Sequence, residues 1–248
     1  MPFFGHIAEL RRRLIVIAAV VVIGSSSLYF WAPQLYDFAM KPVLSIPELA
    51  EKPMNILGPW GTFGLRFTVA LYASIIFGSP IILWQVMAFF LPALKPKERK
   101  FVVPTFIAMA VLFGAGVAFC YWKIIGTAFS WMVSQAWGSV QVLPDARLYF
   151  SGATLLMLGF GLAFQLPIIV FYLVLFNIVP YGKLRSNWRV VYVALMLVAS
   201  IATPDWSPVT MGALFGALIG LYEGSMALAR VLLAKRIAQQ KALGYDVD

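Results

Sequence analysis

The sequence has 248 residues and a formal net charge of +9; 62% of the residues are hydrophobic and only 12% are charged. Soluble domains average about 45–50% apolar and about 25% charged residues, so this chain has too little polar sequence to coat a globule. These values exclude a soluble enzyme and a disordered chain. The basic residues stand in short clusters between apolar runs, which is typical of membrane proteins and argues against nucleic acid as a partner. The sequence predicts an all-α integral membrane protein.

Six apolar runs predict six transmembrane helices. A hydrocarbon core about 30 Å thick takes about 20 helical residues. We expect the spans at residues 14–31, 67–91, 102–126, 148–176, 190–203 and 209–228. Pro80, Pro104 and Pro167 fall within or at the start of spans, where proline removes a hydrogen bond and bends a helix.

The fifth of these spans is short, because 14 residues reach only about 21 Å. We therefore expect short fifth and sixth spans, in a hairpin that thins the bilayer or lies under a protein cap. The loop 32–66 contains five prolines and is long enough to form such a cap outside the membrane. Residues 1–13 have an amphipathic pattern suited to the cytoplasmic interface, and residues 229–248 form a cytoplasmic tail. The whole chain, 1–248, is expected to be one membrane domain.

The Lys and Arg residues predict the orientation of the spans. Fourteen of the 19 lie in the N-terminal segment, the second-to-third and fourth-to-fifth connections and the tail. Cytoplasmic loops have such an excess, so both termini are expected in the cytoplasm. The predicted outer side has only Lys41, Lys52, Arg66, Lys123 and Arg147.

Two carboxylates at the predicted membrane boundary are candidates for ligand binding. Glu9 and Glu98 are the only acidic residues in the three predicted cytoplasmic segments that precede the tail. Glu9 can form a surface ion pair with Arg12 or Arg13, and Glu98 can stabilise the start of the third span. Alternatively, the two carboxylates together recognise a dibasic ligand, for which guanidinium offers a bidentate fork that ammonium lacks.

Polar side chains within the spans are few. Gln165 is the main deep polar residue, and we expect it to face other helices; its simplest role is an interhelical hydrogen bond. Glu223 lies near the cytoplasmic end of the sixth span, where it either snorkels to the interface or pairs with Arg230.

Glycines recur every four residues in the sixth span, at Gly212, Gly216, Gly220 and Gly224. Such a face lets another helix approach closely. The face either packs against the fifth span of the same chain or docks a separate single-span partner.

No catalytic constellation is present. Gly182-Lys183 lacks the upstream glycine of a P-loop. The chain has a single histidine, His6, and a single cysteine, Cys120, so neither an intramembrane serine protease nor a cysteine or histidine metal site is expected. The sequence predicts neither an enzyme nor a cofactor-binding protein.

Several segments, in order along nearly the whole chain, resemble the TatC family, the multispanning subunit of the twin-arginine protein translocase. Residues 6–14 (HIAELRRRL) are similar to the H-x-x-E-L-R-x-R-L opening of that family. Further similarity is found in residues 79–85 (SPIILWQ), 89–94 (FFLPAL), 97–99 (KER), 164–167 (FQLP), 203–204 (TP) and 221–223 (LYE).

The resemblance implies a receptor for twin-arginine signal peptides in the inner (cytoplasmic) membrane. It implies a hetero-oligomer of several copies with single-span TatA- and TatB-type partners, which exports folded proteins with the proton-motive force rather than ATP. The implied fold is a curved, glove-like bundle of six helices under a periplasmic cap.

In the family, the glutamates that match Glu9 and Glu98 contact the paired arginines of the signal peptide. Other functionally sensitive positions are matched by Arg11, Arg13, Phe89 and, in the cap, Pro42.

The chain departs from the family at the predicted polar and docking positions. Many members have glutamate where this chain has Gln165, whose amide cannot titrate. Many have Asp-Pro where this chain has Ser207-Pro208, and Asp205 comes two residues earlier as a possible stand-in. With the glycine face included, the candidate docking residues are Thr203, Asp205, Thr210, Met211, Gly212, Gly216 and Gly220.

A small-solute transporter is the alternative function. It would need a polar site near the middle of the membrane and usually an internal repeat. The sequence offers Gln165 alone and no repeat of 20–50 residues, so the receptor is favoured.

Overall fold

The computed structural model of the chain describes residues 3–50, 52–56, 58–90, 102–136, 143–176, 178–203 and 207–234. Over these ranges the backbone is almost wholly helical, with one isolated β-bridge between Asn55 and Asp145. Five helical stretches are long and apolar enough to cross a membrane, and a sixth apolar helix is shorter. The predicted all-helical membrane class is confirmed, whereas the count of six spans and the side on which the termini lie stay predictions.

The helices follow the apolar runs of the sequence. They are α1 (Phe3–Leu28), the 3₁₀ turn η1 (Tyr29–Trp31), α2 (Ala32–Leu44), α3 (Pro47–Ala50), α4 (Pro59–Phe90), α5 (Val102–Phe119), the π-helical turn η4 (Cys120–Ile124), α6 (Ile125–Ser134), α7 (Ala146–Ala163), α8 (Leu166–Leu175), α9 (Tyr181–Ser186), α10 (Trp188–Ala202) and α11 (Pro208–Leu232).

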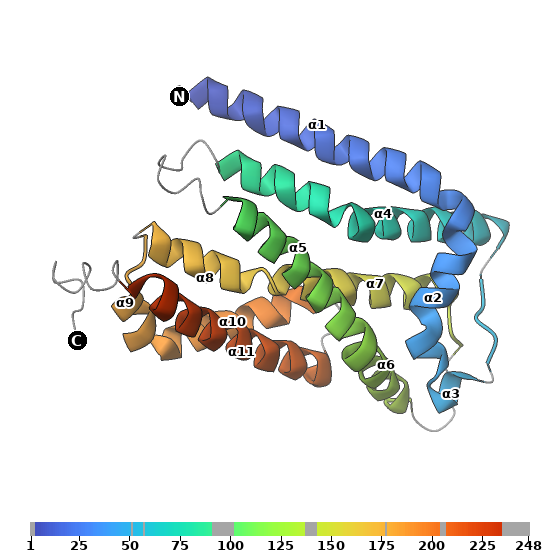
Figure 1. The fold of residues 1–248 in the computed structure, drawn as a ribbon. Helices are drawn as coiled ribbons and strands as arrows, with labels where there is room; N and C mark the ends of the chain where they lie inside the picture. Colours follow the sequence, from blue (N-terminus) through green and yellow to red (C-terminus); the bar gives the residue numbers. More distant parts are fainter. Residues whose placement is uncertain are drawn as a thin grey trace.

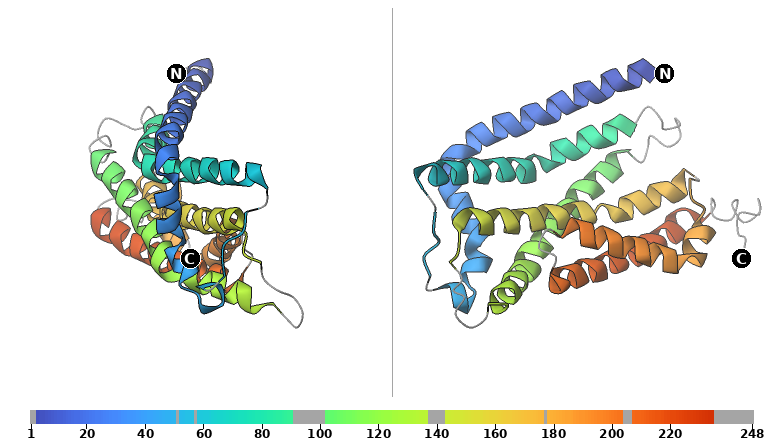
Figure 2. Two further views of the ribbon diagram at one scale, coloured as in Figure 1. Left: turned by 90° about the vertical axis from the view of Figure 1, so that its right-hand side faces the viewer. Right: turned by 180° about the vertical axis from the view of Figure 1, so that it is seen from behind.

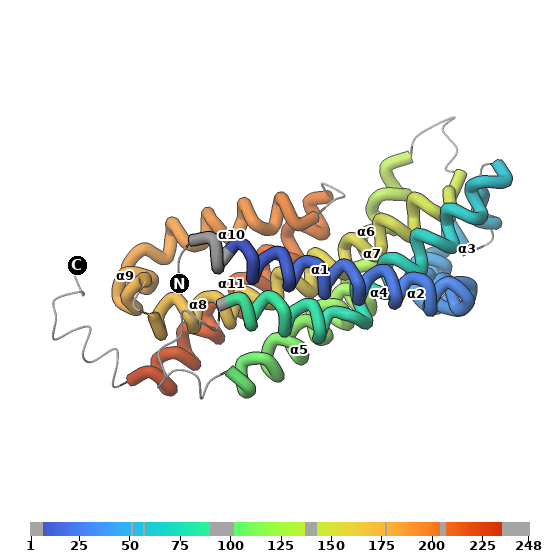
Figure 3. Tube along the Cα trace, turned by 90° about the horizontal axis from the view of Figure 1, so that it is seen from above, coloured from blue at the N-terminus to red at the C-terminus, as the bar shows by residue number. Residues whose placement is uncertain are grey.

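The long helices lie side by side in a fan (Figure 1). α1 is at one edge and packs mainly on α4, while α7 and α8 lie between the α1–α4 pair and the α10–α11 hairpin (Figure 2). α5 crosses α7 obliquely. Figures 1 and 3 place α2, α3 and α6 at one end of the bundle, which we call the cap end. The opposite end, with Phe3, α9 and the last turn of α11, we call the terminal end.

The predicted cap forms from residues 32–58 rather than 32–66. α2 lies across the cap end (Figure 1) and buries Met40 and Val43 in the main core, together with Leu49 of α3. α4 begins eight residues before the predicted start of the second span. Pro59 is suited to the first position of a helix, Gly58 supplies the positive φ of 73° before it, and the exposed Arg66 is tolerated on the helix surface.

The helix that contains the predicted sixth span is longer than that span. α10 has 15 residues, whereas α11 has 25, about 37 Å. Arg230 lies in the last turn of α11, where a cation is favoured by the helix dipole. How much of α11 lies within the membrane stays a prediction.

The three prolines behave differently from one another. Pro167 is the second residue of α8, directly after a turn at residues 164–165 that separates α7 from α8. Pro104 falls in the first turn of α5, where its missing N–H has no helical partner to lose. Pro80 lies inside α4, which continues on both sides of it. Of the three prolines, only Pro167 therefore lies next to a break in a helix.

Glycine permits a close contact between α5 and α7 in the bundle core. A Cβ atom on Gly116 of α5 would lie 2.6 Å from the carbonyl oxygen of Phe160 on α7 and 3.0 Å from the Cα of Gly161. Real Cβ atoms do not come so close to backbone atoms, so the α5–α7 crossing requires glycine here.

Candidate functional site

A polar cluster joins α1 to α4 toward the terminal end. Arg13 donates from Nε and Nη2 to the same oxygen of Glu9, at 3.3 Å and 2.6 Å, and from Nη1 to Oε1 of Gln85 on α4 at 3.3 Å. The side chains of Glu9 and Arg13 are only 22% and 21% exposed, because their side of α1 faces α4. The expected pairing of Glu9 with Arg13 is confirmed, and the pair is more sheltered than an ordinary surface ion pair.

Phe89 lies near this cluster. α1 and α4 run antiparallel, and Arg13 meets Gln85. Moving one helical turn toward the terminal end reaches Glu9 on α1 and Phe89 on α4, so these two residues lie at about the same level. Arg11 is exposed on the outer side of α1. Glu98, the second predicted carboxylate, lies outside the described residues.

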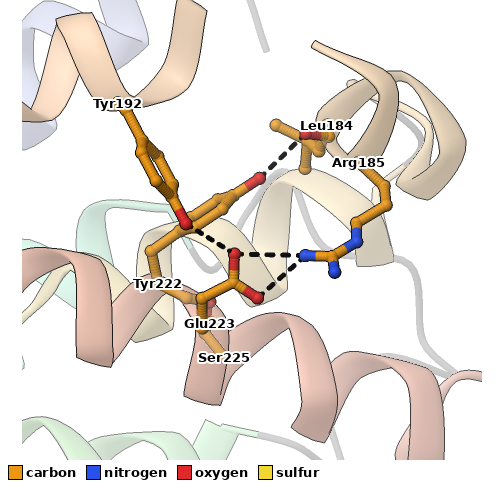
Figure 4. Close-up of polar contacts among 6 residues, drawn as sticks. All are labelled: Leu184, Arg185, Tyr192, Tyr222, Glu223 and Ser225. Carbon is orange, nitrogen blue, oxygen red and sulfur yellow. Dashed lines mark hydrogen bonds and ion pairs between the residues drawn. The ribbon is translucent and has the colours of Figure 1, made fainter. Parts of the chain in front are cut away.

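A second carboxylate links three helices at the terminal end (Figure 4). Nη1 of Arg185 on α9 lies 2.8 Å and 3.1 Å from the two carboxylate oxygens of Glu223 on α11, and the Tyr192 hydroxyl of α10 donates to Glu223 at 3.0 Å. The Tyr222 hydroxyl donates to the Leu184 carbonyl at 2.9 Å. Hydrogen bonding to Glu223 and its charge raise the pKa of the Arg185 guanidinium. Glu223 pairs with Arg185 rather than with Arg230, so that alternative was wrong, whereas its snorkelling to the interface stays a prediction.

Gln165 makes the interhelical contact expected from its position. It is 7% exposed, and its Nε2 donates to the Met109 carbonyl of α5 at 3.1 Å and to the Gly161 carbonyl at 3.4 Å. Its Oε1 is buried and has no hydrogen-bond partner in the described part of the chain.

The predicted docking residues divide into a buried and an exposed group. Thr203 and Thr210 are 2% and 0% exposed, and each hydroxyl donates to a backbone carbonyl one turn back. Met211 is half-buried and accepts a hydrogen bond from Ser200 of α10. These three residues are engaged within the chain, and Asp205 lies outside the described residues.

The glycines of α11 form the exposed group. A Cβ on Gly212, Gly216, Gly220 or Gly224 would meet no atom within 4 Å. The opposite face of the helix buries Leu214, Leu218 and Tyr222. The interpretation that the glycines pack on the fifth span was therefore wrong, and the face is open.

Pro42 occupies the predicted cap. It lies inside α2, and its carbonyl oxygen accepts a hydrogen bond from Ser45 at 2.8 Å. A Cβ on Gly126 of α6 would be 3.7 Å from the same oxygen. Pro42 thus lies where α2 packs on α6, far from the cluster around Glu9.

Sequence reasoning missed Gln85, Arg185 and Tyr192 as members of these clusters. A signal existed for Gln85, which is a polar residue one turn before Phe89 in an apolar run. No such signal existed for Arg185, because its partner Glu223 is 38 residues away.

These features define a multi-pass helical membrane protein with two ion-paired carboxylates toward one end of its bundle. The family model described as Sec-independent protein translocase protein (TatC) matches residues 5–216. The chain belongs to the TatC family. It is thus a component of a protein translocase, and the alternative of a small-solute transporter receives no support.

Relatives and solved structures agree with this assignment. The Sec-independent protein translocase protein TatC of Synechocystis sp. is 34% identical over 232 residues, which are 94% of this chain and 89% of that protein. The chloroplastic protein of Pisum sativum is also 34% identical, over 93% of this chain and 64% of its own length. A crystal structure described as the twin-arginine translocase receptor TatC matches with a TM-score of 0.74 and 25% identity, over 91% of this chain and 98% of that one.

Proposed function

We propose that this chain is the signal-peptide receptor subunit of a twin-arginine translocase in the cytoplasmic membrane. It binds the paired arginines of signal peptides through Glu9 and Glu98, and it works with TatA- and TatB-type single-span subunits to export folded proteins with the proton-motive force. The observation that carries this proposal is the sheltered Glu9 carboxylate, which already accepts two N–H bonds from a guanidinium.

The geometry of this contact favours arginine over lysine. Arg13 uses three nitrogens at once, two on Glu9 and one on the Gln85 amide. A lysine ammonium is a point charge without the planar fork that meets both groups. A signal-peptide arginine finds the same carboxylate and amide, and it binds by sharing them with Arg13 or replacing it. Arg13 is thus part of the site, as is Phe89 one turn from Gln85.

The open glycine face of α11 is the proposed docking site for a single-span partner. Close approach between membrane helices depends on small residues, and Gly212, Gly216 and Gly220 are exposed in a row. The buried Thr203 and Thr210 support the end of α10 and the start of α11 from within rather than contacting the partner.

The test of the receptor function is peptide binding to the purified full chain. A labelled signal peptide with Arg-Arg and its Lys-Lys variant are titrated against wild type, Glu9→Gln, Glu98→Gln and the control Glu48→Gln, which removes an exposed carboxylate of the cap. Each lost charged hydrogen bond costs about 1.5–3 kcal/mol, so we expect the dissociation constant for Arg-Arg to rise about ten- to hundredfold in the first two variants and to stay unchanged in the control. Equal binding of both peptides, or unchanged binding by Glu9→Gln and Glu98→Gln, would contradict the proposed site.

A further inference from the structure

An apolar cavity of about 280 Å³ lies between the cap and the bundle. α2, α4, α5, η4 and α7 line it, with walls that include Phe38, Ala73, Gly114 and Trp122. Its two lining hydroxyls are already used: Tyr121 donates to the Phe38 carbonyl at 2.8 Å and Thr154 to the Phe150 carbonyl at 2.7 Å. Nearly all of the cavity wall is apolar. Such a cavity does not hold ordered water, so an apolar occupant fits it.

The cavity reaches from the cap into the part of the bundle that crosses the membrane. Its α2 wall lies at the cap end, whereas its α4 wall includes Ala73, about 21 Å along the helix from Pro59. α4, α5 and α7 all belong to candidate membrane spans. An occupant that follows this cavity therefore has one end at the cap and the other inside the hydrocarbon region.

Aromatic rings and a cation lie together beside the cavity, at Phe38, Tyr121 and Lys41, and we call this part of its edge the mouth. Phe38 lines the cavity and stacks on Tyr121, with ring centres 5.1 Å apart. The Lys41 ammonium lies 5.8 Å from the centre of the Phe38 ring, within the range of a cation–π contact. Lys41 is exposed, and within the described part of the chain no carboxylate lies within 4 Å of it. Its charge is thus available to an anion at the mouth of the cavity.

We propose that this cavity binds an anionic phospholipid, with one acyl chain inside and the phosphate group at Lys41. The charge of the mouth and the apolar wall match the two parts of such a lipid, and aromatic residues such as Trp122 are typical of the interface where its headgroup lies. An acyl chain is thin enough to enter. The inference is independent of the proposed receptor function.

Two glycines provide a matched pair of variants. Gly114 lines the cavity, and a Cβ placed on it would meet no atom within 4 Å, so Gly114→Leu fills the space without a collision. Gly216 on α11 is equally open and lies away from the cavity, so Gly216→Leu adds the same bulk elsewhere. Lys41→Gln removes the cation and leaves the cavity intact.

The experiment is native mass spectrometry of the full chain from nanodiscs that contain equal amounts of phosphatidylglycerol and phosphatidylcholine. We expect wild type and Gly216→Leu to retain one phosphatidylglycerol, Gly114→Leu to retain at least tenfold less, and Lys41→Gln to lose the preference for phosphatidylglycerol. Retention by Gly114→Leu equal to that of wild type, or an unchanged preference in Lys41→Gln, would overturn the proposal.

A second measurement needs no variant. Phosphatidylglycerol with a photoreactive diazirine near the end of one acyl chain is added to the wild-type protein in nanodiscs. We expect labelling of the α5 and η4 residues between Gly114 and Trp122, and competition by unlabelled phosphatidylglycerol but not by phosphatidylcholine. Labelling confined to helices that do not line the cavity, such as α10 and α11, would overturn the assignment of the cavity.

Discussion

Two sets of glycines in this bundle have opposite surroundings. On α5, a Cβ at Gly116 would press against the backbone of α7, at 2.6 Å from the Phe160 carbonyl oxygen. On α11, a Cβ at any of Gly212, Gly216, Gly220 or Gly224 would meet nothing within 4 Å. Gly116 allows α5 and α7 to come into contact, whereas the α11 glycines form an exposed face on which no described residue packs.

The difference shows that small residues mark two kinds of helix contact that spacing alone does not separate. The regular spacing by four occurs on α11, where none of the described helices packs on the glycines. The tight contact occurs at Gly116 and Gly161, which belong to different helices. Removing a glycine should therefore have opposite effects on stability in the two places.

The largest effect is expected from Gly116→Ala. The added methyl group collides with a backbone carbonyl that cannot rotate away, so the α5–α7 crossing must open, and overpacking of this kind costs about 1–3 kcal/mol. The matched Gly216→Ala adds the same methyl group in open space and raises helix propensity by about 1 kcal/mol. Unfolding of the purified proteins in detergent measures both. Destabilisation of equal size in the two variants would show that the open face is covered within the chain.

The next effect concerns assembly rather than folding, and it depends on the proposed docking face. A cysteine at Gly220 reports contact with single-span partners by crosslinking in membranes. We expect Gly216→Leu to reduce this crosslink at least tenfold, since the bulky side chain holds the partner helix away, while Gly114→Leu leaves it unchanged. Persistence of the crosslink in Gly216→Leu would place the partner elsewhere.

Much of the fold could be predicted because hydropathy directly reports burial in a membrane. The apolar runs located every long helix, and the prolines and length of the loop 32–66 indicated the cap. Helix ends were less predictable. α4 starts before Arg66 and α11 runs past residue 228 and Arg230 to Leu232. Both charged side chains are exposed at the helix surface and do not mark its end.

The candidate site was predictable only where its parts are local. Glu9 and Arg13 are one turn apart, so their pairing follows from helical spacing. The Arg185–Glu223 pair depends on how α9 packs beside α11, and the direction of the glycine face depends on Leu214 and Leu218 facing the core. Spacing within one helix shows that a face exists, but only the packing of the other helices shows which face remains open.

The smallest effect is expected at Gln165, beside the tight α5–α7 contact. Its Nε2 makes one hydrogen bond across to α5, and such bonds are worth about 0.6 kcal/mol on average within membranes. Its Oε1 is buried without a partner in the described part of the chain, and an unsatisfied buried acceptor costs about 1–3 kcal/mol. Methionine has nearly the same shape as glutamine, so Gln165→Met removes both the Nε2 hydrogen bond and the unsatisfied Oε1 acceptor.

Removing the unsatisfied acceptor (about 1–3 kcal/mol) outweighs losing the hydrogen bond (about 0.6 kcal/mol), so the free energy of unfolding of Gln165→Met should match or exceed that of wild type. Unfolding in detergent measures this, with Gly116→Ala as the destabilised reference in the same part of the bundle. A loss as large as that of Gly116→Ala would mean that Oε1 has a partner such as a buried water. The α5–α7 contact would then depend on a polar network as well as on close packing. The glycine face of α11 has no side chains that could form such a network.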